Sequence, residues 1–338
     1  MPLLVGDSPL SECCSASGKS PLQFVCDALK VPTLEWLDSF PCPTQLSDGD
    51  KVLYVGQREV ATIVRPGETS VVCPEWVGSQ DATTCTIAAL HNAEHSLTTV
   101  AHLDNADTRR QVADFLEAAL QALPCTLTAE LRRGDDCFDL HLCGGFLVPG
   151  RERQNEESHS DTLRELDGQS TFRLNLKTAC LGPLNRTTHR EGDRMRTIPR
   201  AYGLAVHCPS GRVASADFSC SVPAEELRSC RQWFGEDNLG LHSVFDWKNN
   251  RIEIRPFHCS TDRRFVEYAL SKSDDWILRN LSTSPDAEPP HFVAQIRKTF
   301  QFAMENPGIQ HCFGASSCSR ETLKFTMGAD GLWKRVVM

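Results

Sequence analysis

The sequence predicts an α/β fold in which helices and strands are mixed along the chain rather than alternating as regular βαβ units. Many short segments rich in β-branched residues follow one another, and turn-forming residues separate them. Two longer segments, residues 107–123 and 289–304, carry apolar residues at helical spacing. Because strands outnumber these helices and no internal repeat organises them, the pattern favours an α/β sandwich.

Residues 107–123 form the clearest predicted helix, since their apolar residues recur at spacings of three and four. Asp107 is placed to cap its first turn, and Pro124 ends it. The second amphipathic helix, residues 289–304, begins with two prolines that preset its first turn. One more helix is predicted around residues 20–37 within an otherwise turn-rich start. Residues 1–50 are therefore expected to be an irregular or helical lead segment packed on the core.

The remaining elements are predicted strands within a single domain, residues 51–338. Residues 150–171 and 185–200 are polar and predict loop-like insertions into this domain. A hairpin is expected around residues 248–250. The predicted strands lie within residues 51–64 (two strands), 70–73, 96–102, 126–131, 138–143, 172–181, 202–208, 212–218, 243–247 and 251–257.

Charge and cysteine content limit the class of protein. The formal net charge of −9 argues against a nucleic-acid-binding surface, which needs a basic stripe. No run approaches the ~20 apolar residues of a membrane span, and the start of the chain does not resemble a secretory signal. A long chain with 16 cysteines and no such signal is expected in a reducing compartment, with free thiols. We therefore expect a protein of the cytoplasm, with the nucleus as a second location.

Cys85 and His102 are the strongest candidates for chemistry. Cys85 lies where small polar residues give way to an apolar run, which places its thiol at the end of a buried element. The segment that follows is a predicted strand ending in His102, whose imidazole can lie beside that thiol. A neighbouring imidazole can activate a thiol as a nucleophile at neutral pH. Thr83 and Thr84 add hydroxyls, and backbone N–H groups near Cys85 are candidates for an oxyanion hole.

Two other interpretations compete with this pair. Any single cysteine among so many is usually a buried structural thiol. His91 and His95 are four residues apart, which would place both on one face of a helix, a pattern that can bind zinc. The ligand set for a metal lacks a convincing closing pair, so no metal site is predicted.

Two segments also carry a family resemblance. Residues 79–85 (Ser-Gln-Asp-Ala-Thr-Thr-Cys) resemble the nucleophile segment of eukaryotic protein N-terminal asparagine amidohydrolases, and residues 280–293 resemble a second signature of that family. The resemblance implies an α-β-β sandwich related to bacterial toxin deamidases, with no cofactor. It implies Cys85 as nucleophile, His102 as its base and a serine as orienting group, for which Ser79 is the candidate.

The same resemblance implies the substrate class, which is proteins or peptides with a free N-terminal asparagine. Such a site needs an acid for the ammonium group and acceptors for the carboxamide. We expect substrate contacts from Asp81, Thr84, Ser284 and Glu288, and Asp104 is a further acid in the motif regions. The implied reaction converts asparagine to aspartate in the N-degron route, by a protein that we expect to be monomeric. The alternatives are another Cys-His amide or ester hydrolase of this fold, or a non-catalytic metal-binding interaction protein.

Overall fold

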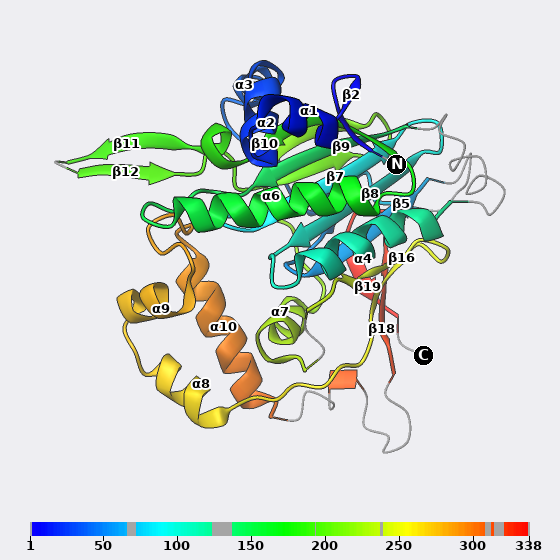
Figure 1. Cartoon of the computed structure of the whole chain (residues 1–338). Helices are drawn as coiled ribbons and strands as arrows, with labels where there is room; N and C mark the ends of the chain where they lie inside the picture. The colour runs from blue at the N-terminus through cyan, green and yellow to red at the C-terminus, as the bar shows by residue number, and fades with distance from the viewer. Residues whose placement is uncertain are drawn as a thin grey trace.

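A computed structural model describes residues 2–65, 72–123, 137–192, 194–236, 239–307, 312–313 and 321–336 (Figure 1). An eight-stranded sheet is its centre, in the order β15-β5-β8-β7-β9-β10-β1-β2. Strands β5, β8, β7 and β9 pair antiparallel, whereas β9, β10 and β1 pair parallel. The bounds are β1 Leu3–Val5, β2 Ser8–Pro9, β5 Glu59–Val64, β7 Thr86–Asn92, β8 Leu97–Leu103, β9 Cys137–Gly144, β10 Arg173–Cys180 and β15 His242–Ser243.

Three smaller sheets accompany the large one. A five-stranded sheet has the order β3-β14-β13-β6-β4, and a four-stranded sheet has the order β16-β17-β18-β19. Strands β11 and β12 form a hairpin that projects from the body of the molecule (Figure 1). The bounds are β3 Thr44–Leu46, β4 Val52–Tyr54, β6 Trp76–Ser79, β11 Thr187–Glu191, β12 Arg194–Ile198, β13 Leu204–His207, β14 Arg212–Phe218, β16 Phe245–Asp246, β17 Arg251–Ile254, β18 Leu323–Met327 and β19 Trp333–Arg335.

The two faces of the large sheet bury different partners, and strand β7 shows the division. Successive side chains of a strand point to opposite faces. Ala88 and Leu90 join a core cluster with the helices, whereas Ile87 and Ala89 join the cluster that includes Val77 of the five-stranded sheet. The apolar run after Cys85 is therefore buried on both faces, with helices on one side and a second sheet on the other.

Helices α4 and α6 lie side by side across the first face (Figure 1). Helices α1 and α2 pack in the same cluster, while α7 to α10 gather on the other side of the large sheet. Asp107 caps α4 by accepting a hydrogen bond from the backbone N–H of Arg110, as predicted. The bounds are α1 Leu10–Ser17, α2 Pro21–Ala28, α3 Lys30–Asp38, α4 Thr108–Gln121, α6 Glu152–Gln169, α7 Glu225–Phe234, α8 Arg263–Leu270, α9 Asp274–Leu281 and α10 Phe292–Glu305.

Several sequence predictions are wrong in detail. Residues 150–171 are not a loop, because they contain the 18-residue helix α6. Residues 185–200 contain the β11–β12 hairpin rather than an irregular insertion. The first 50 residues are more regular than expected, since β1 pairs with β10 and adds a strand to the large sheet. The predicted helix at residues 20–37 is two helices that meet at Leu29.

Other predictions fall partly or wholly outside the described residues. The strand predicted at residues 126–131 lies outside them, and so does half of the strand predicted at residues 70–73; Val72 and Cys73 are described and are not strand. The cysteines that the structure describes are free. In the described ranges, no helix is long and apolar enough to span a bilayer.

Candidate active site

Cys85 immediately precedes β7, and a pair of glycines at the end of β9, Gly144 and Gly145, holds its backbone. The N–H of Gly145 donates to the carbonyl oxygen of Cys85 at 2.7 Å, and the N–H of Phe146 donates to that of Thr83 at 2.8 Å. A Cβ atom on Gly144 would lie 2.2 Å from the same Cys85 oxygen, and Gly144 has φ +114°. Only glycine fits such a close backbone approach at that dihedral. The Gly144-Gly145 pair therefore fixes the segment that carries the thiol.

His102 faces the second sheet from the middle of the fold. It lies opposite Ile87 in the β7–β8 ladder, so its side chain points toward the layer that Ile87 and Val77 share. Ser79 ends strand β6 in the five-stranded sheet, and its Oγ lies 2.7 Å from Nδ1 of His102. Both residues are buried. This contact bridges the two sheets.

The other imidazole nitrogen, Nε2 of His102, has no hydrogen-bond partner within the described residues, and it is not bonded to Cys85. Burial lowers the pKa of His102 to about 4, and the negative charge of Asp104 opposes that shift. Burial, with Asp104 and Glu288 nearby, raises the pKa of the Cys85 thiol. At neutral pH the pair consists of a neutral thiol and a neutral imidazole, rather than a preformed ion pair.

Asp104 follows His102 by two residues and is held by four donors. Arg58 Nε forms an ion pair with Oδ2, and Gln57 Nε2 donates to the same oxygen at 3.4 Å. Gln111 Nε2 and the N–H of Ala106 donate to Oδ1 at 2.6 Å and 3.1 Å. Burial raises the pKa of Asp104, but the hydrogen bond from Gln111 and the charge of Arg58 outweigh it, and the net effect is a lowered pKa. The sequence did not indicate the roles of Arg58 and Gln111, because their contacts to Asp104 come from separate elements.

Glu288 belongs to the segment before α10 and is tied to the nucleophile segment through two serines. Ser282 donates to its Oε1, and the hydroxyl of Ser284 lies 3.0 Å from the same oxygen. Ser284 is buried and also lies 2.8 Å from the hydroxyl of Thr83. Burial raises the pKa of Glu288, an effect that the two serine hydroxyls oppose. No described residue donates to its second oxygen, Oε2, which leaves that atom available to a ligand.

Asp81 and Thr84 border the same region. The carboxylate of Asp81 lies 3.0 Å and 3.1 Å from Nε2 of His291, and this hydrogen bond raises the pKa of His291. Asp81 has φ +64°, a left-handed conformation that re-aims the chain at the end of β6. Thr84 Oγ1 lies 2.9 Å from Thr283 Oγ1, so this contact also joins the nucleophile segment to the segment before α10.

These residues surround one cleft of about 630 Å³. Cys85 and His102 lie in its wall, as do Asp81, Thr84 and Glu288, while helices α7 and α10 form the opposite wall. Ser79 contacts His102 from the buried side, and Ser284 contacts Glu288. The structure thus brings together all the residues that the sequence nominated for catalysis and substrate binding. A recess of about 710 Å³ shares Gln80, Asp81 and Glu288 with the cleft, and the β11–β12 hairpin forms part of its wall.

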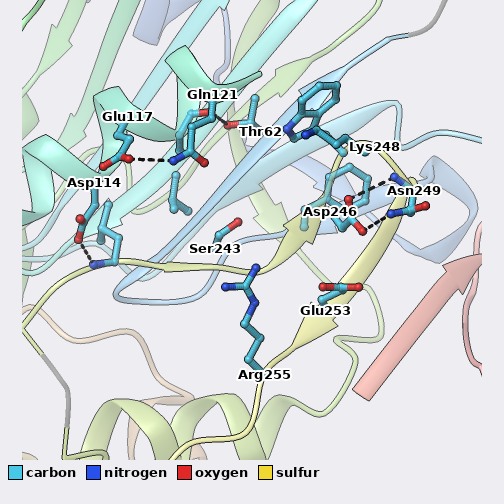
Figure 2. A pocket seen from close by; sticks show the side chains of 15 residues that line it. Thr62, Asp114, Glu117, Gln121, Ser243, Asp246, Lys248, Asn249, Glu253 and Arg255 are labelled. Carbon is cyan, nitrogen blue, oxygen red and sulfur yellow. Dashed lines mark hydrogen bonds between the residues drawn. The ribbon is translucent and has the colours of Figure 1, made fainter. Parts of the chain in front are cut away.

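A separate cleft of about 510 Å³ lies between α4, β5 and the β16–β17 hairpin (Figure 2). It shares no lining residue with the Cys85 cleft. Its lining carboxylates accept hydrogen bonds from neighbouring groups: Asp114 from the N–H of Leu241, Glu117 from Gln121, and Asp246 from Asn249 (Figure 2). Among the described residues that line it there is no cysteine or histidine to supply thiol or imidazole chemistry.

The competing interpretation, in which His91 and His95 share one face of a helix, is wrong. His91 lies in strand β7 and contacts the hydroxyl of Thr98 at 3.0 Å, whereas His95 lies in the turn that follows the strand. The two residues therefore share no helical face. Across the described part of the chain, no group of three or more histidine, cysteine, aspartate or glutamate side chains is arranged to hold a metal ion.

The fold and the cleft define a class of protein. A mixed α/β body with a thiol and an imidazole in the wall of one cleft, and a serine hydroxyl against the imidazole, has groups suited to an enzyme that uses nucleophilic chemistry. A sequence model of the family described as protein N-terminal asparagine amidohydrolase matches residues 42–335. Relatives with that name are 32% identical over 286 residues in Homo sapiens and 32% identical over 287 residues in Mus musculus, each match covering 84% of both chains. An Arabidopsis thaliana relative of the same name is 27% identical over 316 residues, 86% of this chain and 83% of its own. The chain belongs to the protein N-terminal asparagine amidohydrolase family.

Proposed function

We propose that this protein deamidates the side chain of an N-terminal asparagine and releases an N-terminal aspartate and ammonia. The observation that carries the proposal is the cleft itself, which both Cys85 and His102 line, with the hydroxyl of Ser79 2.7 Å from Nδ1 of the imidazole. The names of the relatives supply the substrate class. The reaction needs only a nucleophile, a base and water, so no cofactor takes part in the scheme.

The chemistry proceeds in two steps. With Nδ1–H donating to Ser79, Nε2 of His102 takes the thiol proton while the sulfur of Cys85 attacks the carboxamide carbon. The imidazolium then passes its proton to the departing nitrogen, which leaves as ammonia, and a thioester remains. Water attacks the thioester with His102 again as base, which releases the aspartate carboxyl group and restores the thiol. Backbone N–H groups beside Cys85 stabilise the oxyanion.

Glu288 is the acid that we assign to the substrate ammonium group. Its Oε1 already accepts from Ser282 and Ser284, its Oε2 has no donor among the described residues, and the residue lines the cleft. Asp81 is less suited to this role because His291 lies against both of its oxygens. Since Glu288 lines both the cleft and the adjoining recess, an amine bound there leaves the carboxamide beside Cys85 and the rest of the polypeptide in the recess.

The fixed distance between this acid and the thiol provides the selectivity for asparagine over glutamine. One additional methylene moves the carbonyl carbon of glutamine away from the position of attack, and small misplacements of reacting atoms are costly. A blocked amine would leave Glu288 unpaired in a partly buried site, which also costs binding energy. Thr84 and Ser284 complete the polar surroundings of the carboxamide in this scheme.

The arrangement of helices, large sheet and second sheet supports our assignment to the α-β-β sandwich of toxin-deamidase-like cysteine hydrolases. We assign residues 51–338 to the catalytic domain and residues 1–50 to a lead segment packed on it. We also propose that the protein acts as a monomer in the cytoplasm and in the nucleus. Its product enters the N-degron route. Free thiols among the described cysteines suit a reducing compartment.

Ammonia release from short peptides tests the proposal. A peptide with a free N-terminal asparagine should release one ammonia per molecule, whereas peptides that begin with glutamine, aspartate or N-acetyl-asparagine should release none. Cys85→Ala should reduce the rate at least about 10³-fold, as expected for loss of a nucleophile, and Cys208→Ala, which removes a buried thiol outside the cleft, should not. Release from N-acetyl-asparagine or an amide elsewhere would assign a different hydrolase activity. Full activity of Cys85→Ala would overturn the mechanism.

A further inference from the structure

Asp104 is a charged group in the wall of the Cys85 cleft for which the proposed reaction has no use. An ionised carboxylate offers about four lone-pair positions. In Asp104 four donors occupy them: Gln57, Arg58, Gln111 and the N–H of Ala106. The side chain is 6% exposed. It is therefore saturated by the protein, and it is unsuited to receive the substrate amine.

The position of Asp104 suits a different role. Thr86 pairs with Leu103 at the end of the β7–β8 ladder, and Cys85 and Asp104 are the residues adjacent to that pair, just outside the ladder. Asp104 also follows His102 by two residues, and Cys85, His102 and Asp104 all line the cleft. A single negative charge thus lies at the end of the two strands that carry the thiol and the imidazole. Its four donors keep that charge in place.

A negative charge at this position acts on both groups in the same direction. It raises the pKa of Cys85 and also raises the pKa of His102, against the lowering effect of burial. Arg58 opposes its effect on the thiol, and Glu288 adds to it. The other charged groups that line the cleft are Asp81 and, from helix α7, Glu225. Ser79 touches the imidazole but is neutral, so it cannot supply this electrostatic effect.

We propose that Asp104 is a positioning residue that keeps Cys85 as a protonated thiol in the empty cleft and stabilises His102 as an imidazolium while the thiol proton is transferred. The second half of this statement rests on the proposed deamidation, but the first half does not. In the step itself the proton moves from sulfur to Nε2 as the carbon–sulfur bond forms. The sulfur then carries no net charge, and the only new cation is the imidazolium beside Asp104.

This role predicts two effects of Asp104→Asn with opposite signs. The rate at which iodoacetamide alkylates Cys85 can be followed by mass spectrometry as a function of pH. The pH at which this rate is half-maximal should fall by about 1 unit, because the nearby negative charge is lost. The value of kcat for the asparagine peptide should fall about 10-fold or more over the same pH range, because the imidazolium loses its counter-charge. A purely structural role would not make the thiol more acidic while slowing the reaction.

Two further variants keep the test decisive. Asp107→Asn retains a good helix cap outside the cleft and should change neither measurement. Arg58→Gln removes the positive charge that opposes Asp104, so it should raise the pH midpoint of Cys85 alkylation. If a thermal melt shows that Asp104→Asn does not fold, the Arg58→Gln result tests the proposal in its place. An unchanged or raised midpoint in folded Asp104→Asn, or a lowered one in Arg58→Gln, would overturn the inference. Absence of deamidation by the wild-type protein would instead reject the proposed function, while the alkylation midpoints would still test Asp104.

Discussion

Ser79 Oγ and His102 Nδ1 lie 2.7 Å apart although the two residues belong to different sheets. Ser79 ends β6 of the five-stranded sheet, and His102 lies in β8 of the eight-stranded sheet. The packing of one sheet on the other therefore sets the orientation of the imidazole. This polar contact between the two sheets couples the fold to the candidate chemistry.

Ser79→Ala should lower kcat about 100-fold and leave the fold intact. The serine selects the tautomer and the ring orientation of His102, but it carries no charge. Its loss should therefore lower kcat by less than the ~10⁴-fold seen when the orienting aspartate of a Ser-His-Asp triad is replaced by asparagine. Steady-state ammonia release gives kcat, and a thermal melt checks the fold.

Ser215→Ala is the matched control for that experiment. Ser79 and Ser215 are both buried serines that flank Leu204 of β13 in the same sheet, one on each side. Ser215 does not line the cleft. If both alanine variants lose activity equally, the contact between Ser79 and His102 has no special role.

Gly144→Ala should disable the site through the backbone of Cys85. A Cβ atom would lie 2.2 Å from the Cys85 carbonyl oxygen, and the residue has φ +114°. The segment must move, so activity should fall at least about 10²-fold, as expected when a reacting atom is displaced by ~1 Å. Gly150→Ala is the control, because it also has a positive φ (+84°) but open space around it. Equal activity loss in the two variants would contradict a role for the close contact.

The sequence indicated the site residues that lie close together along the chain, but not the residues that contact them from other elements. Cys85 precedes β7 and His102 lies in β8, and these antiparallel strands are joined by a tight turn. An apolar run and a second strand-like run were therefore enough to predict that both residues line one cleft. Ser79 came from the same short motif as Cys85. Arg58 and Gln111 were missed because they reach Asp104 from the turn before β5 and from helix α4, and nothing in their local sequence indicates this contact.

Helix α6 was missed for a different physical reason. Its buried face is mostly polar, with His159, Ser160 and Thr162 beside Leu163 and Leu166, so the apolar periodicity that identifies a helix is weak. The β11–β12 hairpin is rich in threonine and arginine and buries little apolar surface, which removes the alternation that identifies a strand. In α6 tertiary contacts outweigh the local pattern, whereas the hairpin forms through the pairing of its own two strands.

Glu288→Gln should weaken binding more than it slows the chemistry. The carboxylate is assigned to the substrate ammonium, and charge-assisted hydrogen bonds are worth about 1.5–3 kcal/mol, so KM for an asparagine peptide should rise at least about 10-fold with a smaller change in kcat. Asp286→Asn, an exposed acid two residues earlier, is the control. A fall in kcat with an unchanged KM would place Glu288 in the chemical step instead.

Buried neutral histidines should make the protein sensitive to acid, and His159 offers the clearest case. Burial lowers its pKa from 6.5 to about 4 in the folded state. Between these values the unfolded chain binds a proton that the folded chain does not, so the free energy of unfolding falls as pH decreases, by at most about 1.4 kcal/mol per pH unit for one group. His102 adds a similar contribution over the same range.

Urea unfolding at pH 7, 6 and 5 should show a shallower loss of stability in His159→Gln than in the wild type. His189→Gln, on the exposed face of β11, should retain the wild-type slope. An unchanged slope in His159→Gln would mean that the buried imidazole is already protonated in the folded protein, or that it is not sealed from solvent beneath Thr86 and Gly145.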